Sequence, residues 1–294
     1  MDAGAVLLPQ NGILKMNVTS RSDITRILNE NGLSPLKRFG QNFLVDGNIT
    51  RKIAESTGAG SGDCVFEIGT GLGALTKELL TRAEKVLSVE IDDGLFSLVQ
   101  TSLGRPDNLL VLHQDILKTD IRDEAGKFFQ HRPFFVCGNL PYYITSKILM
   151  KLLESQAPIL GITVMVQKEV AMRLTAQKDD PNYGAITASC NYFAQPEYLF
   201  TVSKNCFYPV PDVDSAVLRL NMKEPFYVPR KKYETVVRAA FAMRRKTIFN
   251  NLKQLKDAKA VSGALEKSRI PERARAQEIS PEEFCTLTKN LYDL

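Results

Sequence analysis

Long apolar runs are missing from this sequence of 294 residues. None approaches the roughly 20 residues that a membrane-spanning helix needs, so we expect no membrane partner. Residues 3–8 are apolar, but they lack a basic flank and are too short for a signal peptide. Residues 1–35 contain no motif that we can interpret, and we treat them as an N-terminal extension.

Cysteine and histidine are too sparse to support several kinds of chemistry. The five cysteines are widely spaced, odd in number and form no Cys-x-x-Cys pair, which argues against a disulfide framework or a zinc site and favours the reducing cytoplasm. Only two histidines are present, His113 and His131, in unrelated contexts. We therefore expect no metal and no histidine-based nucleophile. We also expect the protein to be a monomer.

Positive charge is concentrated in one part of the chain. Residues 230–275 contain fourteen Lys and Arg against four Asp and Glu, a local excess of ten, although the whole chain has a net charge of only +5. A basic segment joined to a mildly acidic body indicates a polyanionic partner. A helical face that is simply solvated would give the same count, so charge alone leaves both interpretations open.

The first two-thirds of the chain alternates short apolar runs with amphipathic helical patterns. Runs typical of strands occupy residues 64–68, 86–90, 109–113, 134–137 and 162–166. Because these runs are almost continuously apolar, they indicate a parallel sheet that is buried on both faces. The alternation predicts an open, doubly wound α/β sheet of the Rossmann type. Two later runs, 197–202 and 215–221, predict an antiparallel pair at one edge.

The pattern becomes helical after Pro225. Residues 232–243, 247–256 and 281–291 show helical patterns, and Pro225 and Pro229 flank an expected linker. We therefore predict a catalytic sheet domain over residues 36–225 and a small, basic, helical domain over residues 226–294.

A glycine-rich turn follows the first predicted strand, with the sequence Gly69-Thr70-Gly71-Leu72-Gly73-Ala74. Glycines permit a tight turn and a close approach of the backbone to a ligand, and the helix that follows offers free N–H groups. Glu90 ends the next strand, 21 positions after Gly69, a spacing that suits acceptance from ribose hydroxyls. The same pattern fits a nicotinamide or flavin dinucleotide, so this motif alone leaves the cofactor class open.

A second carboxylate follows the third predicted strand. Asp115 stands at the carboxyl edge of the sheet, where ligands of open sheets bind. Its side chain could accept a hydrogen bond from the adenine amino group of a cofactor, and we place Ile91 and Ile116 in the same site. A helix cap at Asp115 is the structural alternative.

The fourth predicted strand leads into Gly138-Asn139-Leu140-Pro141-Tyr142, which matches the [DNS]-[LIP]-P-[YFW] signature of amino methyltransferases. The N6 lone pair of adenine is delocalised into the ring, so the amine needs acceptors for its two hydrogens as the new bond forms. The Asn139 side-chain oxygen and the Leu140 carbonyl can supply them. Pro141 stiffens the loop and Tyr142 offers a ring for base stacking. An ordinary turn is the alternative.

With these motifs in order, the chain resembles the small-subunit ribosomal RNA adenine dimethyltransferases, the KsgA family, from about Leu36 to Leu255. Residues 37–44 are similar to the N-terminal motif of the family, residues 207–217 to its late FxPxPxVxSA motif, and residues 241–247 to its basic entry into the C-terminal domain. The resemblance implies a class I methyltransferase fold and S-adenosylmethionine as cofactor. It also implies dimethylation of two adjacent adenosines near the 3′ end of small-subunit rRNA, linked to ribosome biogenesis.

The resemblance also assigns individual residues. It implies that Phe207 is a second aromatic that holds a flipped adenine against Tyr142, although a core position before a strand is the alternative. It implies a cofactor site that includes Asn42, Leu44, Gly69, Gly71, Glu90, Asp115 and Asn139. It implies RNA phosphate contacts, which we expect at Lys37, Arg38, Arg244, Arg245 and Lys246. Thr70 and Tyr143 depart from the common Pro and Asn of the family, with small expected effects.

Three other functions fit part of the sequence. A large-subunit rRNA methyltransferase of the macrolide-resistance type would share the chemistry, but the motifs at 207–217 and 241–247 favour the small-subunit target. A ribosome-assembly or RNA-binding factor that no longer catalyses would have little need of an intact Asn139–Tyr142 motif. A nicotinamide dehydrogenase leaves that motif and the basic segment unexplained.

Overall fold

The computed structural model describes residues 18–36, 40–104 and 106–294. Within these ranges the main sheet has seven strands in the order β4-β3-β2-β5-β6-β9-β7. Its strands are β2 (Cys64–Ile68), β3 (Lys85–Glu90), β4 (Leu109–His113), β5 (Phe134–Asn139), β6 (Ile159–Gln167), β7 (Ala194–Val202) and β9 (Ser215–Met222). The first five run parallel to one another, and β9 is antiparallel to both β6 and β7. The predicted Rossmann-like sheet with an antiparallel edge is confirmed.

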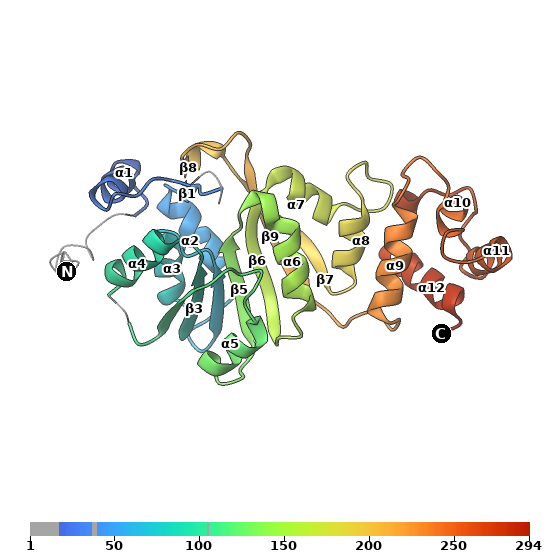
Figure 1. Cartoon of the computed structure of the whole chain (residues 1–294), viewed down its shortest axis with the longest axis horizontal. Coiled ribbons are helices and arrows are strands. Elements are labelled where there is room, and N and C mark those ends of the chain that lie inside the picture. The colour runs from blue at the N-terminus through green and yellow to red at the C-terminus, as the bar shows by residue number, and fades with distance from the viewer. Residues whose placement is uncertain (1–17, 37–39, 105) are drawn as a thin grey trace, which may run out of the picture.

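Alternate side chains of the central strand β2 enter two separate cores. Val65 packs in a cluster with residues of α2 (Gly47–Glu55) and α3 (Ala74–Leu80). Phe66, one position later, packs with residues of α5 (Ile121–Phe129) and α6 (Thr145–Glu154). Because successive side chains of a strand point to opposite faces, helices cover the sheet on both sides, and α5 and α6 lie in front of it in Figure 1. This burial explains the continuous apolar runs of the sequence.

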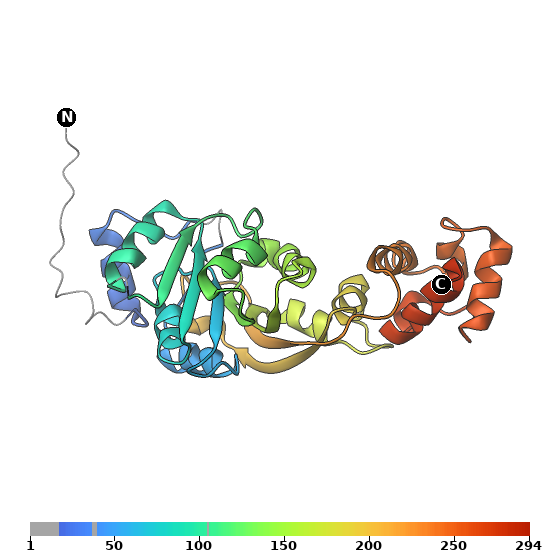
Figure 2. The same ribbon diagram turned by 90° about the horizontal axis from the view of Figure 1, so that it is seen from below.

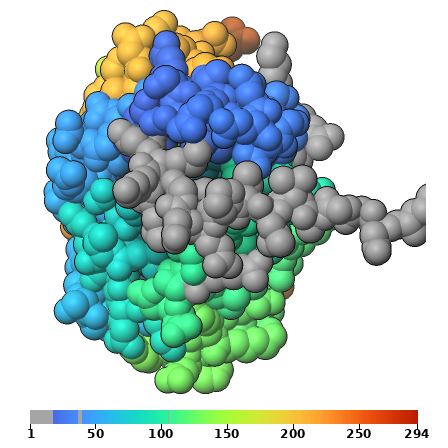
Figure 3. Space-filling model, turned by 90° about the vertical axis from the view of Figure 1, so that its left-hand side faces the viewer, coloured from blue at the N-terminus to red at the C-terminus, as the bar shows by residue number. Residues whose placement is uncertain are grey.

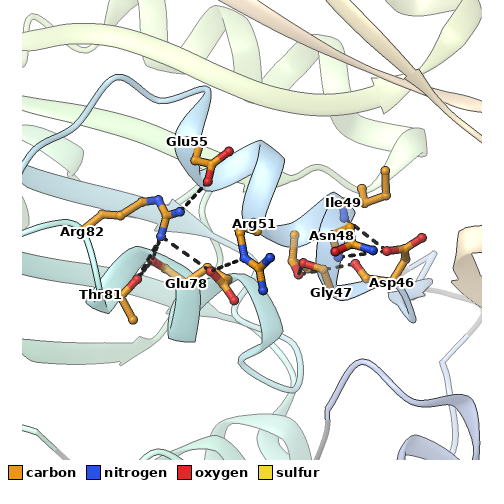
Figure 4. Close-up of polar contacts among 10 residues, drawn as sticks. Asp46, Gly47, Asn48, Ile49, Arg51, Glu55, Glu78, Thr81 and Arg82 are labelled. Carbon is orange, nitrogen blue, oxygen red and sulfur yellow. Dashed lines mark hydrogen bonds and ion pairs between the residues drawn. The ribbon is translucent and has the colours of Figure 1, made fainter.

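Polar contacts fix the two helices on the α2–α3 face (Figure 4). Asp46 caps α2, since its Oδ1 accepts hydrogen bonds from the N–H groups of Asn48 and Ile49. Arg82 follows α3 and donates to Glu55 of α2 at 2.8 Å between Nη2 and Oε1. Because α2 follows residues 43–44 and α3 follows the glycine turn, these contacts hold two segments that approach the same edge of the sheet.

A second, two-stranded sheet lies at this edge and pairs β1 (Phe43–Leu44) with β8 (Phe207–Tyr208). Beside it (Figure 1), α1 (Arg21–Glu30) packs against α4 (Asp93–Ser102) in a small apolar cluster. This helix falls within the segment that we treated as an extension and for which we predicted no helix. Its three buried side chains, Ile24, Ile27 and Leu28, have the i, i+3, i+4 spacing of one helical face, so this pattern could have revealed it.

The C-terminal helices lie at the end of the molecule opposite to α1 (Figures 1 and 2). The helices after β6 are α7 (Lys168–Thr175), α8 (Ala185–Asn191), α9 (Arg230–Ala240), α10 (Ile248–Leu252), α11 (Ala258–Lys267) and α12 (Pro281–Tyr292). Short 3-10 turns occupy η3 (Tyr142–Ile144), η4 (Lys204–Cys206) and η5 (Ala276–Glu278). The sequence predicted helices near α9, α10 and α12 but not α11. Residues 241–246, expected to belong partly to a helix, form turns.

The helical segment shares a core with the sheet region. Tyr233 of α9 packs on Tyr192 with ring centroids 5.1 Å apart and on Phe226 at 5.6 Å, and all three belong to the cluster that covers the α5–α6 face. A division of the chain near residue 225 therefore stays a prediction. No helix among the described residues combines the length and the apolar character needed to cross a membrane.

Candidate active site

A cavity opens at the carboxyl edge of β2, β3 and β5. Its empty volume is about 900 Å³, part of which is open to solvent. Val18 and residues from four segments line it, namely 40–44, 69–72 with 74–75, 90–91 with 95, and 139–142. The structure therefore brings together the glycine turn, the Glu90 strand end and the Asn139–Tyr142 motif, which lie up to 73 positions apart in the sequence.

The glycine turn lines this cavity with backbone that most residues adopt only with strain. Gly69 has φ of 79° and Gly71 has φ of 56°, both in the left-handed region that favours glycine. An added Cβ at Gly69 would lie 3.7 Å from the Asn139 carbonyl oxygen, so the turn runs close beside the catalytic motif. Such a cradle of exposed backbone before a helix fits the polar part of a nucleotide-type cofactor.

The Glu90 carboxylate forms part of the cavity wall and is almost fully buried at 6 % exposure. It accepts three backbone hydrogen bonds, from Gly71 at 2.8 Å, from Ile91 at 2.9 Å and from Asp92 at 3.0 Å. Burial raises the pKa of this carboxyl, and the backbone N–H groups act against that rise. Because a carboxylate has about four acceptor positions, one remains for a ribose hydroxyl. Ile91 lines the cavity beside it.

Asp115 and Ile116 lie outside the described lining of this cavity. Asp115 Oδ1 accepts a hydrogen bond from the Leu117 N–H at 2.9 Å, and the Asp115 carbonyl accepts from Lys118 and Thr119. The side chain thus stabilises a local turn, in a role that resembles the helix cap given as the structural alternative. Ile116 is buried in the α5–α6 core. Their contact with a cofactor stays a prediction.

The Asn139–Tyr142 motif is held by backbone and side-chain hydrogen bonds on three sides. Asn139 Nδ2 donates to the Asn42 carbonyl at 3.1 Å, which fixes the orientation of the amide and leaves Oδ1 without a partner among the described residues. The Leu140 N–H donates to the Met165 carbonyl on β6 at 3.0 Å. The Pro141 carbonyl accepts from the Thr145 hydroxyl at 3.0 Å. Two acceptors are therefore placed before any substrate binds.

Tyr142 lines the cavity and is anchored by a contact that the sequence did not predict. Its hydroxyl lies 2.7 Å from Ser215 Oγ, at the start of β9. Ser215 is fully buried at 0 % exposure, and burial raises the pKa of the Tyr142 phenol, which keeps it protonated. Ser215 stands in the late motif at residues 207–217, so its position in the sequence was visible but its role was not.

Phe207 occupies a different environment from the one expected. Its side chain is fully buried, at 0 % exposure, in the cluster that contains Leu44, Val202 and Val217. In this structure it is a core aromatic on β8, and stacking on a base would require β8 to move. Its contact with a flipped adenine therefore stays a prediction.

The predicted RNA contacts differ in their surroundings. Lys37 and Arg38 lie outside the described residues. Arg244 Nη2 donates to the carbonyls of Pro181 at 3.1 Å and Tyr183 at 3.3 Å, so it ties the turn after α9 to the segment between α7 and α8. The side chains of Arg245 and Lys246 are exposed and have no hydrogen-bond or ion-pair partner among the described residues. Within the described residues, no group of three or more His, Cys, Asp or Glu is arranged to hold a metal.

The fold and the site define a class I methyltransferase: a Rossmann-like sheet with a nucleotide cradle beside an Asn-Leu-Pro-Tyr motif at the carboxyl edge. Residues 34–293 match the model of the ribosomal RNA adenine dimethylase family. The chain belongs to this family, whose cofactor is S-adenosylmethionine, and the resemblance inferred from the sequence is confirmed.

Individual relatives agree with this assignment. A ribosomal RNA small subunit methyltransferase A from Bacillus licheniformis is 42% identical over 277 residues, which cover 91% of this chain and 95% of the relative. One of the same name from Shouchella clausii is 39% identical over 287 residues, 95% and 97% of the two chains. The structure of the 23S rRNA methyltransferase ErmE has a TM-score of 0.67 at 30% identity, over 85% of this chain and 99% of that one. A dimethyladenosine transferase from Plasmodium falciparum has a TM-score of 0.73 at 26% identity, over 83% and 95%.

Proposed function

We propose that this chain transfers methyl groups from S-adenosylmethionine to the N6 amines of two adjacent adenosines near the 3′ end of small-subunit rRNA, as a step in ribosome biogenesis. Relatives named for the small subunit share 42% and 39% of their aligned residues with it. The large-subunit enzyme ErmE is also similar, at 30% identity. The higher identity therefore favours the small-subunit target.

The observation that carries the proposal is the anchored Asn139 amide. When bound, S-adenosylmethionine supplies a methyl group already activated by its positive sulfur, so positioning the amine accounts for most of the catalysis. Asn139 Oδ1 and the Leu140 carbonyl accept the two hydrogens of the amine. Their own bonds to Asn42 and Met165 hold them in place beforehand, which avoids the cost of reorganising them as the reaction occurs.

Other residues hold the cofactor and the base. We assign the ribose to the free acceptor position of Glu90, and the polar tail to the turn that contains Gly69 and Gly71, with Asn42 and Leu44 opposite. Tyr142 lines the same cavity and stacks on the target base. Asp115 and Phe207 are retained as candidates that would need local movement.

The basic C-terminal segment is the proposed RNA-binding surface. Arg245 and Lys246 are exposed on the turn after α9, within the segment that has ten excess positive charges. Exposed Lys and Arg bind the phosphate backbone without reading sequence. We propose that residues 226–294 act as a helical RNA-binding domain on the assembling small subunit, and that the protein is a cytoplasmic monomer.

Two substitutions at one position test the mechanism. Asn139→Ala removes the acceptor, and we expect a loss of about 10²–10³ in the single-turnover rate of methyl transfer, with folding and S-adenosylhomocysteine binding retained. Asn139→Asp keeps an oxygen acceptor and should retain more activity than Asn139→Ala. Equal rates for Asn139→Ala and the wild-type chain would defeat the mechanism.

The substrate is tested with labelled cofactor on undermethylated small subunits, large subunits and naked rRNA, followed by mapping of the modified bases. We expect label on two adjacent adenosines of small-subunit rRNA. Label on large-subunit RNA alone would select the macrolide-resistance type, and no transfer to any RNA would select an RNA-binding assembly factor.

A further inference from the structure

One wall of the cofactor cavity depends on a helix that precedes the match to the family model, which begins at residue 34. Ile24, Ile27 and Leu28 of α1 are buried in a single apolar cluster. The cluster includes four residues that also line the cavity, which are Val18, Phe43, Leu72 and Leu95. The side chains that shape the cavity on this side are therefore supported from behind by α1.

The position of α1 is peripheral. Figure 3 shows this helix in dark blue on the outside of the molecule, against the lighter blue and teal of the sheet region and near the yellow segment that contains β8. The helix has ten residues, and isolated helices of this length are marginal in water. Its order therefore depends on the contacts that it makes with the cavity wall.

The segment after α1 adds contacts around Glu90. The Leu33 side chain fills the space over Gly94, where an added Cβ would lie 2.3 Å from Leu33 Cδ2. The Leu36 N–H donates to Gln41 Oε1 at 2.8 Å, and Gln41 Nε2 donates to Asp92 Oδ2 at 3.3 Å. The Asp92 N–H in turn donates to the Glu90 carboxylate. A chain of hydrogen bonds thus joins residue 36 to the proposed ribose acceptor.

The same helix also contacts β8, the strand that contains the predicted base-stacking residue Phe207. Arg21 Nη2 lies 3.5 Å from the Phe207 carbonyl oxygen, and the guanidinium carbon lies 5.9 Å from the centre of the Tyr208 ring. Because β8 pairs with β1, which lines the cofactor cavity, α1 contacts both the cavity wall and the strand of the predicted base-stacking residue.

We propose that residues 18–36 form a releasable wall of the cofactor site, which docks behind the side chains that line the cavity, retains the cofactor, and undocks to let the spent cofactor leave. The inference rests on the proposed function, since dimethylating two adenosines requires the cofactor to be replaced between successive transfers. Segments held by few buried contacts open locally at much lower free energy than the whole fold, and such opening often limits turnover.

Hydrogen exchange on the full-length protein tests the docking step. We expect the amides of α1 to exchange more slowly when S-adenosylhomocysteine is bound, because a ligand that binds the docked form more tightly shifts the equilibrium toward it. Unchanged exchange in α1 at a saturating concentration of S-adenosylhomocysteine would overturn the wall.

Substitutions test retention. Leu33→Ala removes the contact over Gly94 without touching the buried face of α1, and Ile24→Ala with Ile27→Ala weakens the helix itself. Both should speed the dissociation of S-adenosylhomocysteine, the double variant by about tenfold, which corresponds to about 1.4 kcal/mol. Asn29→Ala, at an exposed position of the same helix, is the matched control and should match the wild-type chain.

The outcomes separate this inference from the function on which it rests. Dissociation rates equal to wild type in Leu33→Ala and in the double variant would overturn the wall and leave the methyltransferase intact. Failure of the wild-type chain to bind S-adenosylhomocysteine would overturn the cofactor assignment, and the wall with it.

Discussion

The hydrogen bond between Tyr142 and Ser215 gives a prediction about how the target base is positioned. Tyr142 is the last residue of the Asn139–Tyr142 motif, whereas Ser215 lies on β9, 73 positions away in the sequence. The hydrogen bond between the two hydroxyl oxygens, which are 2.7 Å apart, holds the ring at its hydroxyl end. We therefore expect two substitutions to impair the same step. Tyr142→Phe keeps the ring but removes its hydroxyl, and Ser215→Ala removes the partner of that hydroxyl.

The expected size follows from the energy of one hydrogen bond. Such a bond contributes about 1 kcal/mol net, and about 1.4 kcal/mol corresponds to a tenfold change in rate. Each single variant should therefore lose roughly fivefold in kcat/KM for RNA, and the double variant should lose about the same, because either substitution already breaks the bond. Tyr142→Ala also removes stacking, which is worth about 1–3 kcal/mol per base, and should lose more.

The measurement is single-turnover methyl transfer to small-subunit RNA, with melting temperature and S-adenosylhomocysteine affinity followed in parallel. Tyr143→Phe is the matched control, because Tyr143 is the next residue and is 58 % exposed. We expect this control to behave as wild type. If the losses of the two single variants multiply in the double variant, to roughly 25-fold, the two residues act independently and the reasoning is refuted.

Two further predictions concern pH and RNA binding. Burial raises the pKa of the Glu67 carboxyl from 4.5 to about 7, so the folded protein keeps a proton that the unfolded chain has lost. The free energy of unfolding should therefore fall by up to roughly 3 kcal/mol as pH rises from about 4.5 to about 7, and then level off. Urea titrations at several pH values should show this fall in the wild-type chain but not in Glu67→Gln. A fall in Glu67→Gln equal to that of the wild type would exclude Glu67 as its source. Charge reversal at Arg245 and Lys246 should weaken RNA binding and flatten its salt dependence without lowering the melting temperature. Arg244→Ala should also lower the melting temperature, because Arg244 binds the carbonyls of Pro181 and Tyr183. An unchanged salt slope in the first variant would mean that those charges are only solvated.

Local patterns were sufficient to predict the strands whose sequences are almost continuously apolar. The strands β2 and β4 begin and end at the predicted residues, because a continuous apolar run between turn residues has few other stable conformations. The same kind of pattern did not reveal α11, whose core contacts are only Val261, Ala264 and Leu265. A short helix with small residues takes its stability from tertiary packing, and that packing is not visible in its own sequence.

Side-chain surroundings were harder to predict than strand positions. The sequence placed Asn139 and Glu90 at strand ends, and the parallel topology brought those ends to one edge. It could not show that Phe207 would be buried, because this depends on the pairing of β8 with β1, 163 positions away along the chain. It likewise could not show that Arg244 would be bound to two carbonyls, since a count of charges does not distinguish a free guanidinium from an occupied one.

The order of the strands explains why the Gly69 turn and Asn139 lie close together. The connection reverses direction between β2 and β5, the point where open sheets leave a crevice for a ligand. Gly138 on β5 lies opposite Ile68 on β2, and an added Cβ there would lie 2.6 Å from the Ile68 carbonyl oxygen. Glycine at this position therefore lets the two strand ends approach, so that the Gly69 turn and Asn139 come within reach of one small molecule. Gly138 thereby sets the separation between the Gly69 turn, where we propose that the cofactor binds, and Asn139, the proposed acceptor for the amine.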